Sequence, residues 1–154
     1  MTLVSPLENE IAKQIALLAG TQLRLTLMSV AVPGMERSLL QTAVRRAAEP
    51  FDAIGPLADG SIGVISRRNV GPDGGAGVED RFLPRAQATF LTIGGRAVEP
   101  PQCFWFRAVH RWAIELTSAG RLVDALFGMP SRPIGVATPI AKSPPYQPDA
   151  RKAV

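Results

Sequence analysis

The chain has 154 residues, of which 46% are hydrophobic and 19% charged, with a formal net charge of +4. This length and apolar fraction suit one folded domain with a short tail and exclude a wholly disordered chain. A single cysteine, Cys103, and a single histidine, His110, exclude a disulfide scaffold, a cysteine-rich zinc module and a histidine-cluster metal site. No apolar run reaches the ~20 residues that cross a bilayer. The first six residues lack the basic and apolar regions of a secretory signal, so we expect a cytoplasmic protein.

The positive charge is concentrated near the C-terminus. Residues 129–154 hold four basic side chains and one acidic side chain, which leaves only +1 of the net charge for residues 1–128. Binding to nucleic-acid phosphates requires several cations on one surface, so we expect no nucleic-acid partner. The same segment contains six prolines and is expected to form an irregular, basic tail after a domain of residues 1–128. Residues 134–137 could be a short edge strand or a segment that docks on a partner.

The first predicted elements are a helix over residues 6–19 and a strand over residues 23–32. Ser5 can cap the helix, Pro6 suits its first turn and Gly20 can end it. The strand is mostly apolar and carries no charge after Arg24. This composition is typical of a central strand that is buried on both faces.

A second helix is predicted over residues 35–48, followed by a β-hairpin. Apolar residues at helical spacing form the inner stripe of this helix, namely Leu40, Ala43, Val44 and Ala47. The apolar runs 53–57 and 61–66 then flank Ala58-Asp59-Gly60. An Asp-Gly pair between apolar runs is a strong hairpin signal.

The second half of the chain is less regular. The glycine-rich segment 71–77 lacks the lysine of a phosphate-binding loop, and a helix is predicted over residues 78–91 in spite of Pro84. Residues 102–113 alternate as a strand would, but Trp105, Val109 and Trp112 also recur at helical spacing. On periodicity we favour a long helix here and leave the strand open. A last helix is predicted over residues 118–127, with Gly128 at its end.

This order of elements corresponds to the ferredoxin-like βαββαβ plan with a leading helix. We therefore expect an α+β ferredoxin-like sandwich, in which an antiparallel sheet carries helices on one face. The segment 51–65 carries an acidic residue, a short strand, a hairpin and an apolar strand. On this segment and on the order of elements over residues 7–66, the chain resembles the GGDEF-type diguanylate cyclases, which have the nucleotidyl-cyclase fold.

The chain departs from this family at the positions that carry its chemistry. Where the family has two glycines that admit the nucleotide, this chain has Ala58 and Asp59, and Ser61 stands at the catalytic carboxylate. The strand segment 29–32 supplies no metal-binding carboxylate, and the family's Arg-x-x-Asp product site keeps Asp52 but has Glu49 for arginine. Two-metal phosphoryl transfer needs carboxylate oxygens to hold Mg²⁺. The resemblance therefore implies the fold of a degenerate GGDEF-type domain without the activity.

An aromatic segment, residues 103–112, is the candidate partner-binding region. It holds four of the nine aromatic residues of the chain, and tryptophan and arginine are common interface anchors; packing in the core is the alternative use of these rings. The candidate contact residues are Phe104, Trp105, Arg107, Arg111 and Trp112. We expect a non-catalytic protein-binding or scaffolding module that uses this segment and the tail, with no cofactor or metal, and a homodimer is left open. The alternative is a domain that senses GTP or cyclic di-GMP without turnover.

Overall fold

The protein is described by a computed structural model at residues 5–19, 24–68, 76–93 and 100–136. In these ranges it forms a five-stranded antiparallel sheet with four α-helices, in the order α1, β1, α2, β2, β3, α3, β4, α4, β5. The strand order β2-β3-β1-β4-β5 matches the ferredoxin-like arrangement, with one strand added at the β4 edge. The predicted fold class, α+β with a leading helix, is confirmed. The glycine-rich segment 71–77 lies mostly outside the described residues.

The helices begin and end close to their predicted positions. They are α1 (Pro6–Leu17), α2 (Arg37–Ala47), α3 (Ala76–Thr92) and α4 (Ala119–Phe127), with a 3-10 turn, η1, at Ala113–Glu115. Ser5 caps α1, because its Oγ accepts a hydrogen bond from the Glu8 N–H at 3.1 Å. Ser118 caps α4 by the same contact with the Arg121 N–H at 3.2 Å. The predicted inner stripe of α2 is buried as expected.

The sheet is built around β1 (Arg24–Ala31), which is paired on one side with β3 (Ile62–Arg68) and on the other with β4 (Cys103–Trp112). The six residues from Leu25 to Val30 are all buried, which confirms the prediction of a central strand. The edge strands are β2 (Ala53–Pro56) and β5 (Arg132–Gly135).

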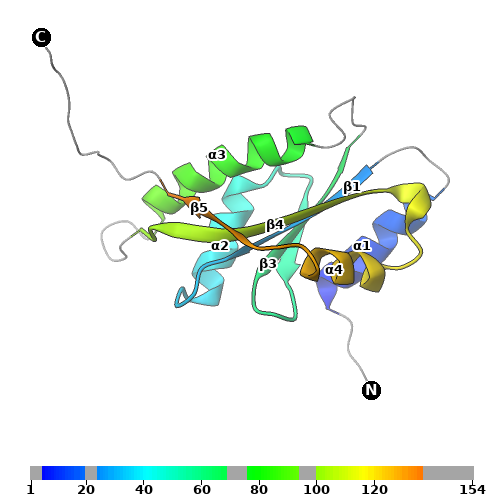
Figure 1. Ribbon diagram of the computed structural model, residues 1–154, viewed down its shortest axis with the longest axis horizontal. Helices are drawn as coiled ribbons and strands as arrows, with labels where there is room; N and C mark the ends of the chain where they lie inside the picture. Colours follow the sequence, from blue (N-terminus) through cyan, green and yellow to red (C-terminus); the bar gives the residue numbers. More distant parts are fainter. Residues whose placement is uncertain (1–4, 20–23, 69–75, 94–99, 137–154) are drawn as a thin grey trace, which may run out of the picture.

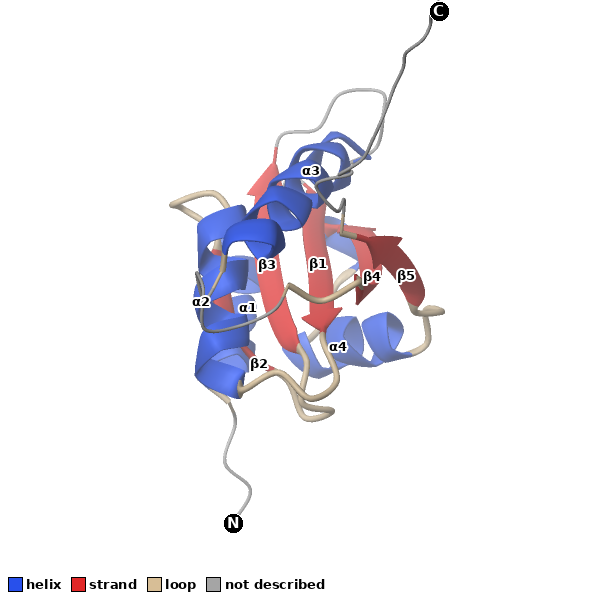
Figure 2. Cartoon of the chain, turned by 90° about the vertical axis from the view of Figure 1, so that its left-hand side faces the viewer, coloured by secondary structure: helices blue, strands red, loops and turns tan. Residues whose placement is uncertain are grey.

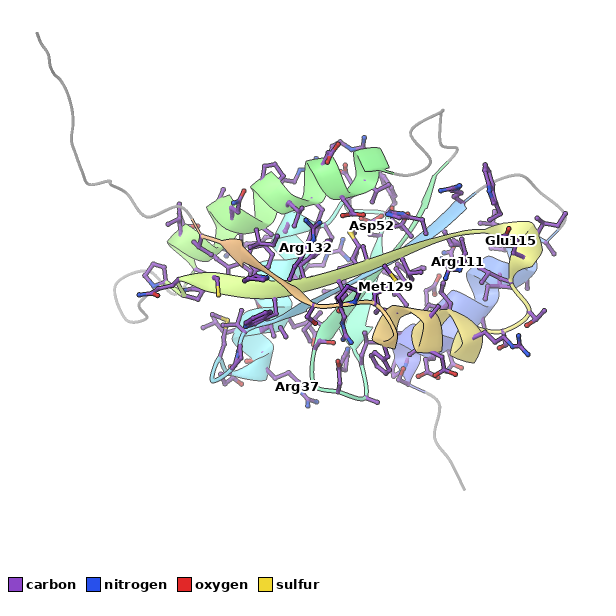
Figure 3. All side chains as sticks on the ribbon, in the orientation of Figure 1. Arg37, Asp52, Arg111, Glu115, Met129 and Arg132 are labelled. Atoms are coloured by element: carbon purple, nitrogen blue, oxygen red, sulfur yellow. The ribbon has the colours of Figure 1, made fainter. Side chains whose placement is uncertain are left out.

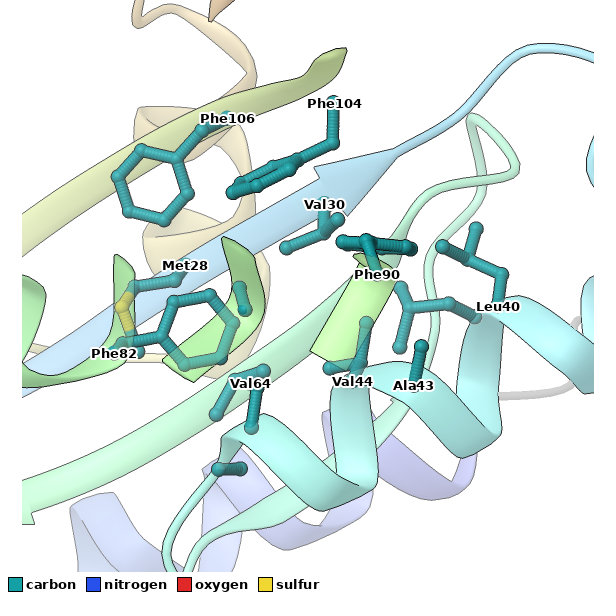
Figure 4. Packing of buried hydrophobic residues seen from close by; sticks show 14 of the residues in the cluster. Met28, Val30, Leu40, Ala43, Val44, Val64, Phe82, Phe90, Phe104 and Phe106 are labelled. Carbon is teal, nitrogen blue, oxygen red and sulfur yellow. The ribbon is translucent and has the colours of Figure 1, made fainter. Parts of the chain in front are cut away.

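Helices cover both faces of the sheet, and the expectation that they share one face is wrong. Met28 and Val30 of β1 pack against α2 and α3, in a core that also contains Phe82 and Phe90 (Figure 4). Leu25 and Leu27 point to the other face and pack against α1 and α4. Figures 1 and 2 show these two helix layers on opposite sides of the strands. The leading helix and the last helix therefore form the second layer, because β1 is apolar on both faces.

Residues 103–112 form a strand, so the favoured helix is wrong and the alternation of the sequence is the better signal. β4 pairs with β1 over eight residues, from Arg24 opposite Trp112 to Ala31 opposite Trp105. Phe104 and Phe106 are buried in the α2/α3 core, whereas Val109 is buried on the α1/α4 face. As a strand, this segment buries side chains on both faces of the sheet. A helix would bring only three side chains at helical spacing to one face and would bury less apolar surface, so the strand is favoured.

The free edge of β2 offers few backbone groups to a further strand, and within β2 only Ile54 directs both its N–H and its C=O outward. The Leu57 N–H donates to the Ser61 carbonyl at 2.8 Å. The backbone groups of successive residues in an antiparallel strand point to alternate sides, so the backbone groups of Pro56 point away from β3. Proline has no N–H to offer a neighbouring strand. The Asp52 carbonyl, which lies just before β2 and also points outward, accepts a hydrogen bond from Arg45 Nη1 at 2.8 Å.

The edge of β5 is partly blocked by the same combination of a proline and a helix side chain. The Val136 N–H donates to the Gln102 carbonyl at 2.9 Å, which turns Pro133 and Gly135 outward. The Gly135 carbonyl accepts a hydrogen bond from Gln87 Nε2 of α3 at 2.8 Å. Because β5 and the buried Val136 belong to the sheet, the packed chain extends past residue 128, where the sequence placed the start of the tail.

Candidate functional site

The β2–β3 hairpin lies where the resemblance implies a nucleotide site. The Leu57–Ser61 hydrogen bond closes its turn, and the Gly60 N–H donates to the Leu57 carbonyl at 3.0 Å. Gly60 has a φ of +89°, a conformation that favours glycine. The predicted hairpin is thus confirmed, with Asp59 at its tip.

Asp59 and Arg107 form the centre of this site. The Arg107 guanidinium, on β4, makes an ion pair with Asp59 Oδ2, and its Nε donates to Ser29 Oγ on β1 at 3.0 Å. The other carboxylate oxygen of Asp59 accepts hydrogen bonds from the Ser61 N–H at 3.0 Å and from Ser61 Oγ at 2.5 Å. The Arg107 guanidinium also lies 5.0 Å from the centre of the Phe127 ring.

The charges of this cluster favour an ionised Asp59. Partial burial raises the pKa of the Asp59 carboxyl, but the two Ser61 hydrogen bonds and the Arg107 guanidinium outweigh it and hold the pKa below its usual value. Arg107 occupies one carboxylate oxygen and Ser61 the other. A divalent cation at this turn would have to displace a fixed positive charge, and Ser29 and Ser61 would offer it hydroxyl groups rather than carboxylates.

No group of three or more His, Cys, Asp or Glu side chains in the described ranges is arranged to hold a metal ion. At the position of the family's product site, Asp52 is buried and its Oδ2 accepts a hydrogen bond from the Glu49 N–H at 3.0 Å. The Glu49 carboxylate lies 3.1 Å from Arg85 Nη1 and 3.8 Å from Arg81 Nε, both on α3. In this structure these two acidic residues therefore link the end of α2 to β2 and α3.

The strand divides the five candidate contact residues between two faces. Phe104 is fully buried, and its ring centre lies 5.1 Å from that of Phe90, so it is a core residue. Trp112 shares its side of the strand and stacks with the Arg24 guanidinium at 4.3 Å. Trp105, Arg107 and Arg111 point to the α1/α4 side.

Trp105 is the exposed member of the aromatic segment. It retains 39% of its accessible surface and belongs to neither core cluster. Figure 1 shows α1 and α4 beside the half of β4 that ends at Trp112, whereas Trp105 lies in the half that begins at Cys103. The exposed Pro133 is its partner on β5, and the half-buried Ala31 is its partner on β1. We call this part of the sheet, around Trp105, Pro133 and Ala31, the Trp105 face; no helix of the described ranges lies over it.

Sequence reasoning missed a second polar cluster, around Glu79 in the first turn of α3. Its carboxylate lies 2.6 Å from His110 Nε2 on β4 and 3.0 Å from Arg132 Nη2 on β5, and Figure 3 shows Arg132 on the side of β4 that faces α3. His110 Nδ1 lies 2.8 Å from Thr26 Oγ1 on the central strand. The hydrogen bond to His110 lowers the pKa of Glu79, and Arg132 adds to this against the effect of burial. Thr26 is buried, so the cluster ties α3 to three strands and offers no accessible nucleophile.

No known family model matches the chain, and no curated protein is significantly similar to it. None of the helices in the described ranges has the length and apolar character that a membrane span requires. The fold and the side-chain geometry are therefore the basis for a functional proposal.

Proposed function

We propose that this protein is a non-catalytic binding or scaffolding module, built on a degenerate GGDEF-like fold, that contacts a protein partner through the Trp105 face and the tail. The observation that carries the proposal is the exposure of Trp105 on a part of the sheet that α1 and α4 leave uncovered. An exposed tryptophan is a residue type that often anchors a protein interface.

The state of the hairpin supports a module without phosphoryl-transfer activity. Asp59 is its one carboxylate, and this carboxylate already pairs with Arg107 and Ser61. Metal-assisted transfer would require at least one carboxylate that is free to bind a cation. Breaking the ion pair to admit the cation would also leave Arg107 beside it, at the cost of charge repulsion.

The small number of outward backbone groups at the two sheet edges favours the face over the edges as the contact surface. A partner that adds a strand needs unpaired N–H and C=O groups. Pro56 and Pro133 remove outward donors, and side chains of α2 and α3 cover an outward carbonyl at each edge. A partner is therefore expected to bind side chains of the Trp105 face rather than the backbone of β2 or β5.

Quantitative affinity purification of the full chain from its native cells tests this proposal. Trp105→Ser should remove a partner that both the parent chain and Ile114→Ser retain, since Ile114 is an exposed apolar residue on η1. A chain that ends at Val136 tests the contribution of the tail. Retention of every partner by Trp105→Ser, or conversion of GTP to a cyclic dinucleotide by the parent chain with Mg²⁺ or Mn²⁺, would overturn the proposal.

A further inference from the structure

The outer side of α2 and the edge strand β2 border an open groove of about 590 Å³. The residues that line it are Ser38, Gln41, Thr42, Arg45, Arg46 and Ile54. We propose that this groove binds a small polyhydroxylated phosphate ester of the size of a sugar phosphate. The volume lies within the range of small-molecule sites, and the site does not include the Asp59 turn of the hairpin or the Trp105 face.

The lining of the groove carries a positive charge. It is lined by two arginines and by no carboxylate. Of the acidic residues nearby in the chain, Glu49 is paired with cations, whereas Glu36 keeps its negative charge beside Ser38, at the end of the groove away from the arginines. Glu36 accepts hydrogen bonds from Ser38 Oγ and the Leu39 N–H, and Glu49 pairs with two arginines of α3. An anionic group is therefore the ligand chemistry that the groove favours.

The two arginines contribute to anion binding in different ways. Arg45 is held in place, because it donates to the carbonyls of Asp52 and Glu49, and it contributes a fixed charge. Arg46 is exposed and makes no hydrogen bond or ion pair with the described part of the chain, and the same is true of the Gln41 side chain. The Arg46 fork can bind two phosphate oxygens at once, and the Gln41 amide can donate to a third.

The hydroxyl groups at the other end of the groove determine the rest of the ligand. Ser38 Oγ donates its proton to Glu36 Oε1 at 2.5 Å, and Thr42 Oγ1 donates its proton to the Ser38 carbonyl at 2.9 Å. Both oxygens keep lone pairs that can accept hydrogen bonds from hydroxyl groups of a ligand. Ser38 and Arg45 are seven residues apart on the helix, about 10 Å, which suits an anion at one end and hydroxyl groups at the other.

The edge of β2 favours such a small ligand over an acidic peptide. A peptide in this groove would lie along β2 and would need several outward backbone groups to pair with. Pro56 offers no N–H, and the Asp52 carbonyl is occupied by Arg45, so within β2 only Ile54 directs both an N–H and a C=O outward. Ile54 remains as an apolar contact for the carbon skeleton of a sugar.

Titration of the ¹⁵N-labelled full chain, followed by NMR, tests this inference. The probes are ribose 5-phosphate, glucose 6-phosphate and glycerol 3-phosphate, with ribose and inorganic phosphate as controls at matched ionic strength. We expect at least one ester to shift the Arg46 Nε–H, the Gln41 side-chain amide and the Ile54 N–H, with a Kd of about 1 mM or below. Ribose should cause no shift, and inorganic phosphate should bind about tenfold more weakly than the ester.

Two variants and one control make the result specific. Arg46→Gln should weaken ester binding about tenfold or more, since a charge-assisted hydrogen bond is lost. Thr42→Val should reduce the preference for the ester over inorganic phosphate. Arg121→Gln, at an exposed arginine of α4, should change neither. The inference is overturned if none of the esters shifts these signals, if inorganic phosphate binds as tightly as the ester, or if Arg46→Gln binds like the parent chain.

Discussion

Arg107 and Asp59 lie 48 residues apart in the chain, yet their charged groups form an ion pair that joins β4 to the tip of the β2–β3 hairpin. The same guanidinium donates to Ser29 of the central strand. One side chain of the aromatic segment thus connects β4 with the hairpin tip and with the central strand. This connection links the fold to the proposal of a non-catalytic module.

Replacement of Arg107 by methionine should raise the pKa of Asp59. Burial of Asp59 then acts without the opposing guanidinium, although the Ser61 hydrogen bonds remain. NMR titration of the Asp59 carboxyl carbon measures the change, with Arg111→Met as the control on the same strand. Because the ion pair is partly exposed to solvent, we expect a loss of only about 1 kcal/mol in the free energy of unfolding. An unchanged Asp59 pKa would contradict the contact.

Glu79 should make the protein sensitive to acid. Its folded pKa lies below the ordinary value of 4.5, so its contribution to stability is complete above that value and is lost as the pH falls through the folded pKa. Urea unfolding at several pH values between neutrality and pH ~3 measures this loss. Glu79→Gln should be less stable near neutrality and should lose less stability on acidification than the parent. An Asp80→Asn variant, at the exposed neighbour of Glu79, should retain the parent's acid sensitivity.

Opening the edge of β5 should lead to self-association. Pro133→Val supplies an outward N–H, and Gln87→Ala uncovers the Gly135 carbonyl. The double variant should form oligomers that light scattering and sedimentation detect as the concentration rises. Pro130→Val, at an exposed proline before the strand, serves as the control. A double variant that stays as monodisperse as this control would contradict the role given to the edge.

Phe104 and Trp105 should differ sharply in their effect on stability. Phe104 is fully buried against Phe90, so Phe104→Ala should lower the free energy of unfolding by about 3–5 kcal/mol. Trp105 is partly exposed and lies outside both cores, so Trp105→Ala should cost clearly less. Chemical denaturation of the two variants provides the comparison. Equal losses would be inconsistent with a strand that points these neighbours to opposite faces.

The sequence predicted a helix or strand correctly where a local signal agreed with the burial of its side chains. The Ser5 cap, the apolar stripe of α2 and the Asp-Gly turn each specify an element from within a few residues. Residues 103–112 satisfied two periodicities at once, and pairing with β1 determined the strand. Because β1 is apolar on both faces, it needs a helix layer on each side of the sheet. The pattern of β1 predicts a central strand, but the fold expected from the sequence had helices on one face only.

The candidate site was predicted less completely, because it depends on long-range contacts. Nothing near Asp59 in the sequence indicates that Arg107 will pair with it, and Glu79 meets His110 only through the packing of α3 on β4. The strand alternation could have separated Phe104 from Trp105, since neighbours on a strand face opposite ways. It could not have shown that Trp105 is exposed, because Val109 points to the same side of β4 and is buried.

Titration of the ¹⁵N-labelled parent chain with Mn²⁺ in the presence of GTP, with product analysis of the same samples, tests directly whether the Asp59 turn binds a metal ion and turns over nucleotide. We expect no site-specific broadening of the Asp59, Gly60 and Ser61 signals and no cyclic dinucleotide. Saturable broadening confined to this turn, together with consumption of GTP, would contradict this expectation.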